Sequence, residues 1–137
     1  MDAEQKQELV GAMMVIIKKE GLPIPTGIKI MQPVYGVKKS IGRCIYSKLK
    51  DEYRITVTTT RAKWVPCEKG KYYNKQTGQH FKRVVGVDAP IGDTINTCAH
   101  EIAHLKFWNH GPQHKSYTNH LYELLKIELG YPKGETQ

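Results

Sequence analysis

The feature that most constrains this chain is a helical pattern near its C-terminus that contains two histidines four residues apart. The pattern should begin near Asp93, a good N-cap that follows a proline and a glycine, and should run to about Trp108. Within it lies the segment HEIAH, residues 100–104. Residues four apart share one face of an α-helix, so His100 and His104 can present two imidazoles to one point.

A break follows this helix at residues 109–112, which read Asn-His-Gly-Pro. Pro112 suits the first position of a last helix, because its missing N–H would have no partner there. Gly130 should end that helix. Its inward side is predicted to carry Tyr117, Leu121, Leu124, Leu125 and Ile127.

The N-terminal half predicts one helix and then strands. Residues 3–20 have apolar side chains at three- and four-residue spacing and predict an amphipathic helix that stops at the following glycine. Residues 27–34, 43–49 and 53–60 predict three strands, arranged as an antiparallel meander. We therefore expect a single α+β domain over residues 1–137, with a small antiparallel sheet and two C-terminal helices.

The middle of the chain is strongly basic. Residues 61–92 predict a hairpin insertion, with Tyr72 and Tyr73 ahead of its turn. Residues 38–83 hold 13 Lys or Arg against three Asp or Glu, a balance of +10 that exceeds the net charge of +8 of the whole chain. Such a block favours an acidic partner, either nucleic acid or an acidic protein surface. The alternative is that these lysines keep a strand-rich region soluble and protect its sheet edges.

The residue types of HEIAH indicate metal-assisted hydrolysis. Two imidazoles with an open coordination position suit one catalytic zinc ion. Glu101 stands beside that position, where it can take a proton from water activated by the metal and later deliver it to a leaving amine. The alternative is a surface helix that carries two histidines by chance. The apolar residues Cys98, Ile102 and Leu105 argue against it, because they give the helix a face to bury.

A catalytic zinc takes three protein ligands, and two residues could supply the third. His110 lies six residues after His104, and a straight helix would carry it about 240° around the axis, away from the site. The break at residues 109–112 allows it to return, so His110 is favoured. Glu123 of the last helix is the alternative third ligand. His114 and Tyr117 are candidates for supporting or substrate-binding groups.

The cysteines and the hydropathy exclude several classes of protein. Cys44, Cys67 and Cys98 are an odd number without a CxxC pair, which argues against a disulfide framework and a cysteine-type zinc ribbon. We expect Cys98 to be a buried apolar residue. No membrane span or secretion signal is recognisable, so we expect a cytoplasmic protein with no membrane partner, and a monomer.

Residues 100–105 followed by residues 109–112 resemble the SprT-like zinc metallopeptidases and the wider, WLM-type group of minimal zincins with HExxH and a third histidine. The resemblance covers residues 93–130 well and 1–60 weakly. It implies that His100, His104 and His110 bind zinc and that Glu101 is the general base. It also implies a zincin-like fold, with helices on one face of an antiparallel sheet whose edge strand binds peptide.

Two departures from that family stand out. The basic insertion at 61–92 has no counterpart in the family pattern, and His114 stands where an aromatic residue is usual.

Three functions follow from these observations. The leading one is a peptidase that cleaves accessible or unfolded protein segments, with Tyr117, Tyr122 or Lys115 as open choices for a donor to the transition state. The second is a nucleic-acid-associated protein in which region 38–83 binds, compatible with a DNA-tethered protease. The third is a metal-binding module without turnover, against which the presence of Glu101 counts.

Overall fold

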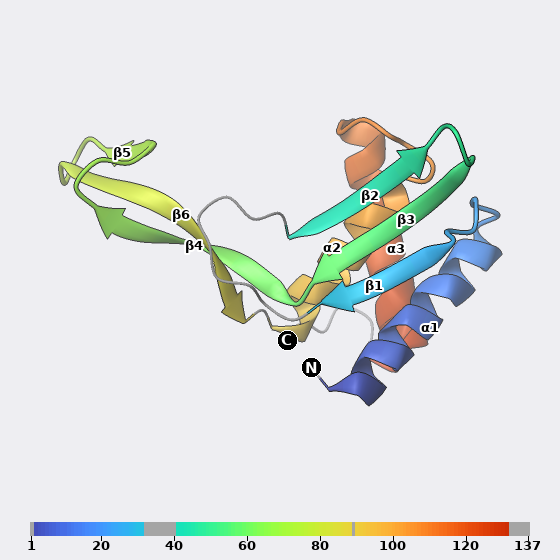
Figure 1. Ribbon diagram of the computed structural model, residues 1–137. Helices are drawn as coiled ribbons and strands as arrows, with labels where there is room; N and C mark the ends of the chain where they lie inside the picture. Colours follow the sequence, from blue (N-terminus) through green and yellow to red (C-terminus); the bar gives the residue numbers. More distant parts are fainter. Residues whose placement is uncertain (1, 32–40, 89, 132–137) are drawn as a thin grey trace.

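A computed structural model of the chain describes residues 2–31, 41–88 and 90–131. In this part of the chain the fold is mixed α+β, with three helices and two small sheets of three strands each (Figure 1). None of the described helices is long and apolar enough to cross a bilayer.

The first sheet contains β1 (Gly27–Met31), β2 (Gly42–Ser47) and β3 (Glu52–Thr58) in the order β1-β3-β2. β2 and β3 form the predicted antiparallel hairpin, but β1 pairs with β3 in parallel, so the predicted antiparallel meander is wrong. β3 takes the central place because Ile55 and Val57 are almost fully buried, at 1% and 0% exposure. The predicted strand 27–34 is present as far as Met31, and its last three positions lie outside the described residues.

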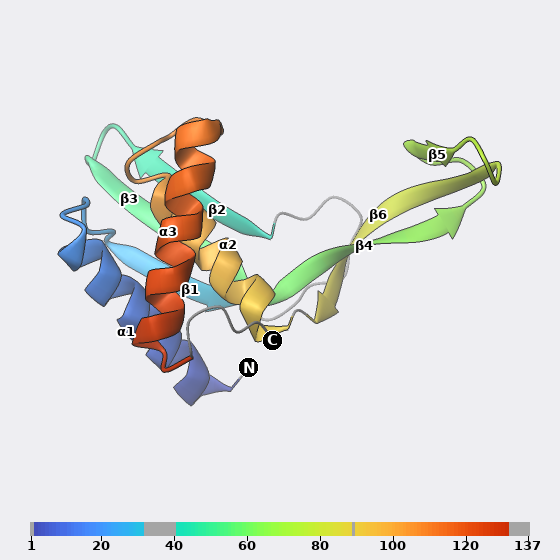
Figure 2. The same ribbon diagram turned by 180° about the vertical axis from the view of Figure 1, so that it is seen from behind.

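Three helices cover one face of this sheet: α1 (Ala3–Lys19), α2 (Ile91–Ala103) and α3 (Pro112–Glu128) (Figures 1 and 2). The predicted starts of α1 and α3 are confirmed, with Asp2 capping α1 and Pro112 opening α3. We call these helices and the first sheet the body. The largest fully buried apolar side chains of its core are Leu9, Met13, Ile17, Ile55, Val57, Ile95, Ile102, Leu121 and Leu125.

The two ends of α2 differ from the prediction. Pro90 is its N-cap, with an extended backbone at φ −56° and ψ 152°, and Asp93 lies in the first turn. There the carboxylate faces the positive end of the helix dipole. The predicted end near Trp108 is wrong, because the helix stops at Ala103 and the next turn tightens into bonds between residues three apart.

Two predictions about buried side chains have different outcomes. Cys98 is fully buried, as predicted, and its burial raises the pKa of the thiol. Ile127, predicted to face the core, is 54% exposed. It follows the buried Leu125 by two residues, which turns it about 200° around the axis of α3.

The second sheet extends from the body as an arm formed by β4 (Thr60–Cys67), β5 (Tyr72–Asn74) and β6 (Gln79–Asp88), in the order β4-β6-β5 (Figure 1). Only Thr59 separates β3 from β4, so the chain passes almost straight from the body into the arm. The hairpin predicted within 61–92 is therefore present, with a third strand added. Its β5–β6 register pairs Tyr72 with Phe81 and Tyr73 with His80.

Candidate metal centre

Helix α2 holds the first two histidines on one face. Because they lie four residues apart, the rings of His100 and His104 lie side by side in an edge-to-face arrangement, with centroids 4.9 Å apart. His104 is the C-cap, and its φ of −65° and ψ of −18° continue the helical direction to the last ring. The opposite face of α2 is buried in the core through Ile95 and Ile102, which fixes the rotation of the helix about its axis.

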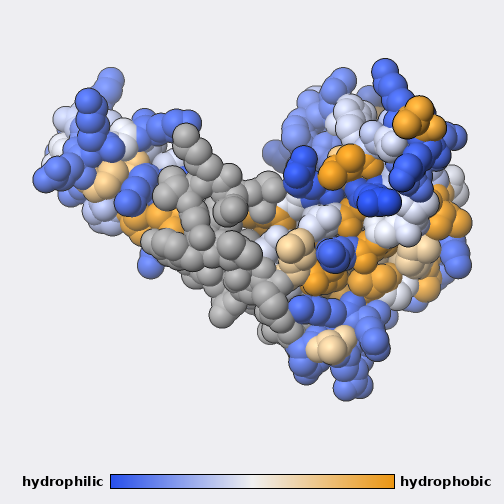
Figure 3. Space-filling view, viewed as in Figure 1, coloured by the Kyte–Doolittle hydropathy of each residue, from blue (hydrophilic) through white to orange (hydrophobic). Residues whose placement is uncertain are grey.

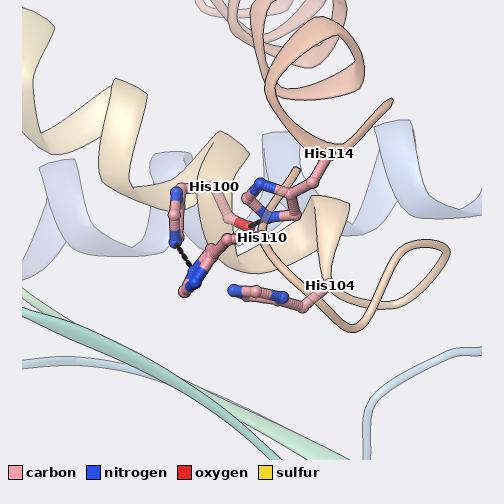
Figure 4. A group of neighbouring side chains, drawn as sticks. All are labelled: His100, His104, His110 and His114. Atoms are coloured by element: carbon pink, nitrogen blue, oxygen red, sulfur yellow. Dashed lines mark hydrogen bonds between the residues drawn. The ribbon is translucent and has the colours of Figure 1, made fainter. Parts of the chain in front are cut away.

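The early end of α2 brings a third and a fourth histidine to the same place (Figure 4). His110, in the connection to α3, has its Nε2 3.1 Å from Nε2 of His100. His114, in the first turns of α3, is 3% exposed and its ring centroid lies 4.2 Å from that of His104. One nitrogen from each of the four rings lies within 4.8 Å of the others. These four histidines could hold a metal ion.

Backbone carbonyls orient two of the rings. His104 Nδ1 lies 2.8 Å from the carbonyl oxygen of Trp108, and His114 Nε2 lies 3.1 Å from that of His100. A ring nitrogen that faces a carbonyl must carry the hydrogen. The His104 ring therefore keeps its Nε2 lone pair for the cluster, which is the arrangement usual for metal-binding histidines.

The spacing of one donor pair is close to that around a tetrahedral ion, while the four donors together lie within 4.8 Å of one another. Zinc keeps imidazole nitrogens at 2.0–2.1 Å, so two such ligands at a tetrahedral angle are separated by roughly 3.4 Å. The distance of 3.1 Å between the Nε2 atoms of His100 and His110 is close to that value. The residues present therefore fit a metal ion, and all of the donors are imidazoles.

The electrostatics of the cluster favour neutral rings. Burial, followed by the neighbouring histidines, lowers the pKa of His100 to about 4. Burial is also the main cause that lowers the pKa of His104 and of His114. Neutral imidazole is the form that binds metal, so at neutral pH these rings do not have to lose a proton before they bind a metal ion.

Glu101 lies at the side of the cluster and faces β2. Its side chain is only 5% exposed, and burial raises the pKa of its carboxyl to about 7. The pKa of Cys44 on β2 is raised to about 12, mainly by burial and then by the charge of Glu101. At neutral pH the thiol therefore keeps its proton, and Glu101 remains the group that can exchange one.

A cleft of about 500 Å³ opens between β2 and the end of α2. One wall is β2, from Gly42 to Tyr46, and the other holds His100, Glu101, His104 and His110 with Trp108. β2 pairs with β3 on one side, and no strand of the described part of the chain pairs with its other edge. An extended peptide added to that edge would lie beside the cleft that the histidines line.

The remaining residues singled out in the sequence lie elsewhere. Tyr117 donates its hydroxyl hydrogen to Oε1 of Glu20, the C-cap of α1, 2.8 Å away, and does not line the cleft. Glu123, the alternative third ligand, is outside the histidine cluster and lies 3.7 Å from Nζ of Lys126. Lys115 lines a second hollow on the α3 side of His100 and His110.

Trp108 had been predicted only as the end of the helix, and Tyr46 only as part of the strand 43–49 and of the basic region 38–83. Tyr46 and Trp108 line the cleft, and Trp108 also fixes the ring of His104 through its carbonyl. The direction of a backbone carbonyl cannot be predicted from the residue types alone. The predicted strand 43–49 included Tyr46, but no short pattern placed that strand on the edge of the sheet.

Comparisons with protein-family models, with curated proteins and with solved structures return no match to this chain.

Proposed function

We propose that this protein is a zinc-dependent metallopeptidase of the SprT-like, zincin type, with the zinc ion held by His100, His104 and His110. The observation that carries the proposal is the convergence of these three histidines with the carboxylate of Glu101 on one cleft. They come from α2 and from the connection to α3, and the cleft runs beside a strand edge that can bind a peptide.

Each residue has a part that follows from its position. A zinc ion, when bound, would lower the pKa of water from 15.7 to about 7 and polarise a substrate carbonyl. Glu101 accepts the proton of the attacking water on its carboxylate and returns it to the amine nitrogen as the C–N bond breaks. The backbone of β2 holds the substrate as an added strand, which orients the scissile bond across the histidines.

Chelation tests the proposal. The zinc-loaded protein is incubated with a fluorescently labelled, disordered polypeptide, and new amino termini are counted. We expect cleavage that stops after treatment with a chelator and returns when zinc is added back. Cleavage that a chelator leaves unchanged, or no cleavage by protein shown to carry one zinc ion, would overturn the proposal.

The ligand set is tested by metal content. We expect His110→Ala to reduce zinc binding by at least a hundredfold, while Glu123→Ala, in α3 and outside the cluster, keeps one ion per molecule. The reverse result would assign the third ligand to Glu123.

His114 favours a second function, a metal-binding module without turnover. Its ring lies in the same cluster, and a fourth imidazole could close the position that a substrate needs. Cobalt-substituted protein distinguishes the two functions, because its visible absorption reports its coordination. We expect the spectrum to change when a hydroxamate is added. An unchanged spectrum would indicate a closed site of four histidines.

A further inference from the structure

The arm carries a row of aromatic rings on one of its faces. Residues that pair directly across a sheet share a face, as do residues two apart along a strand. Trp64 therefore lies on the same face as Tyr72 and Phe81, and the ring centroids confirm this, at 5.9 Å for each neighbouring pair. Trp64 is 52% exposed and Tyr72 is 55% exposed. Large aromatic side chains are thus presented to solvent as a group.

Positive charge lies beside this row, at Arg83 and in the turns, and on the opposite face of the strands, at Lys63 and Lys82. Arg83 pairs with Trp64 across the strands and shares its face. Residues 63–84 hold six Lys or Arg against the single acidic residue Glu68. Within the described residues none of the six forms an ion pair, and the lysines are exposed: Lys63, Lys69, Lys71, Lys75 and Lys82. Hydrophilic side chains cover the outer end of the arm (Figure 3).

Protection of the sheet edges does not account for all of these charges. A sheet edge can be protected by one or two lysines, and the half-exposed aromatic rings that lie between them add nothing to that protection. The outer end of the arm extends away from the body in both views (Figures 1 and 2). The combination of stacking surfaces and exposed cations instead matches the surfaces that bind unpaired bases and their phosphates.

We propose that the aromatic face of the arm, formed by Trp64, Tyr72, Phe81 and Arg83, binds single-stranded nucleic acid. The rings stack on bases, and the lysines at the strand ends and turns contact phosphates. A duplex keeps its bases paired and offers this face only its backbone, so the proposal is specific for single strands. It does not depend on the metal centre, which lies in the body.

Binding is measured by fluorescence anisotropy with a labelled dT20 oligonucleotide, with a duplex of equal length for comparison. We expect single strands to bind more tightly and the affinity to fall with salt, by a slope of about −0.7 for each phosphate contacted. Trp64→Ala should weaken binding by roughly 5- to 150-fold, and Trp64→Phe should restore most of the loss. Trp64→Ala leaves the net charge unchanged, whereas a Lys18→Glu, Lys19→Glu variant on α1 makes the chain more negative outside the arm; it should still bind dT20 more tightly than Trp64→Ala.

A second readout reports stacking directly. The chain has two tryptophans, so a Trp108→Phe background leaves Trp64 as the only one. Its fluorescence should be quenched when dT20 is added. Three results would overturn the proposal: equal affinity for single strand and duplex, unchanged Trp64 fluorescence at saturation, or competition by polyglutamate as effective as that by dT20. The last would assign the arm to an acidic protein surface.

Discussion

The backbone of Gly42 lies directly against the carboxylate of Glu101. A Cβ built on this glycine would stand 2.6 Å from Oε2 of Glu101 and 2.9 Å from Cγ2 of Thr97. Real Cβ atoms are not found so close to other heavy atoms, so only glycine leaves the carboxylate where it is. The strand that would bind the substrate and the proposed base are therefore fixed relative to each other at this contact.

Gly42→Ala should impair catalysis while the metal stays bound. The added methyl group displaces the end of a flexible side chain, so we expect a loss of stability of about 1 kcal/mol, at the low end of the cost of overpacking. The displaced carboxylate no longer reaches the water, and since a general base contributes about 10²–10⁴-fold, cleavage should fall at least tenfold. Zinc content and peptide cleavage are measured on the same preparation.

Gly27→Ala is the matched control for that substitution. Gly27 opens β1 of the same sheet, and nothing lies within 4 Å of a Cβ added there. Cleavage by this variant should equal that of the wild type. Equal activity of both alanine variants would contradict the role given to the contact between Gly42 and Glu101.

The metal-free protein should show the titration of Glu101 in its stability. Burial raises the pKa of this carboxyl from 4.5 to about 7 in the folded state. The contribution of this carboxyl to the stability of the fold is therefore fully present below pH 4.5. It is lost as the pH rises towards 7, because the charged form of the carboxyl is disfavoured in the folded state. The glutamine of Glu101→Gln does not ionise, so the variant keeps its stability as the pH rises. At pH 8 the variant should be more stable than the wild type by about 3 kcal/mol, and at pH 4 the two should be similar.

Urea unfolding of both proteins after chelation, at pH 4 and pH 8, measures this difference. The histidines are the same in the two proteins, so their titration cancels in the comparison. A constant difference between the two pH values would contradict the burial of a titrating Glu101.

Zinc should stabilise the fold, because the four histidines join the end of α2 to the start of α3. At a free zinc concentration 100 times the dissociation constant, the gain is about 2.7 kcal/mol, which raises the melting temperature by roughly 10 °C for a chain of this size. Calorimetry with and without zinc measures the shift. His100→Ala should abolish it, whereas an equal shift in that variant would place the ion elsewhere.

The histidines could be predicted from the sequence because their positions depend on local geometry. A spacing of four residues puts His100 and His104 on one face of any helix, and the break at residues 109–112 lets His110 return. The helix in fact ends earlier, at Ala103, and this early end also brings His114 into the cluster. The exact end depended on hydrogen bonds that the residue types alone did not reveal.

The cleft could not be predicted in the same way, because one wall of it depends on the strand order. The turn at residues 48–51, where Asp51 has a φ of 50°, favours the pairing of β2 with β3, which is local. The parallel pairing of β1 with β3 joins residues that are 27 positions apart in the sequence, such as Gly27 and Arg54. No short sequence motif indicates such a pairing. That pairing leaves β2 at the edge, where it lines the cleft.

The most direct test of the central claim is peptide cleavage by Glu101→Gln protein that has been shown to contain zinc. This substitution keeps the size of the side chain and removes its ability to accept a proton. We predict one zinc ion per molecule in both proteins and cleavage at least a hundredfold slower in the variant. Cleavage by the variant at the rate of the wild type would contradict the account, because the buried carboxylate beside the histidines would then have no part in the reaction.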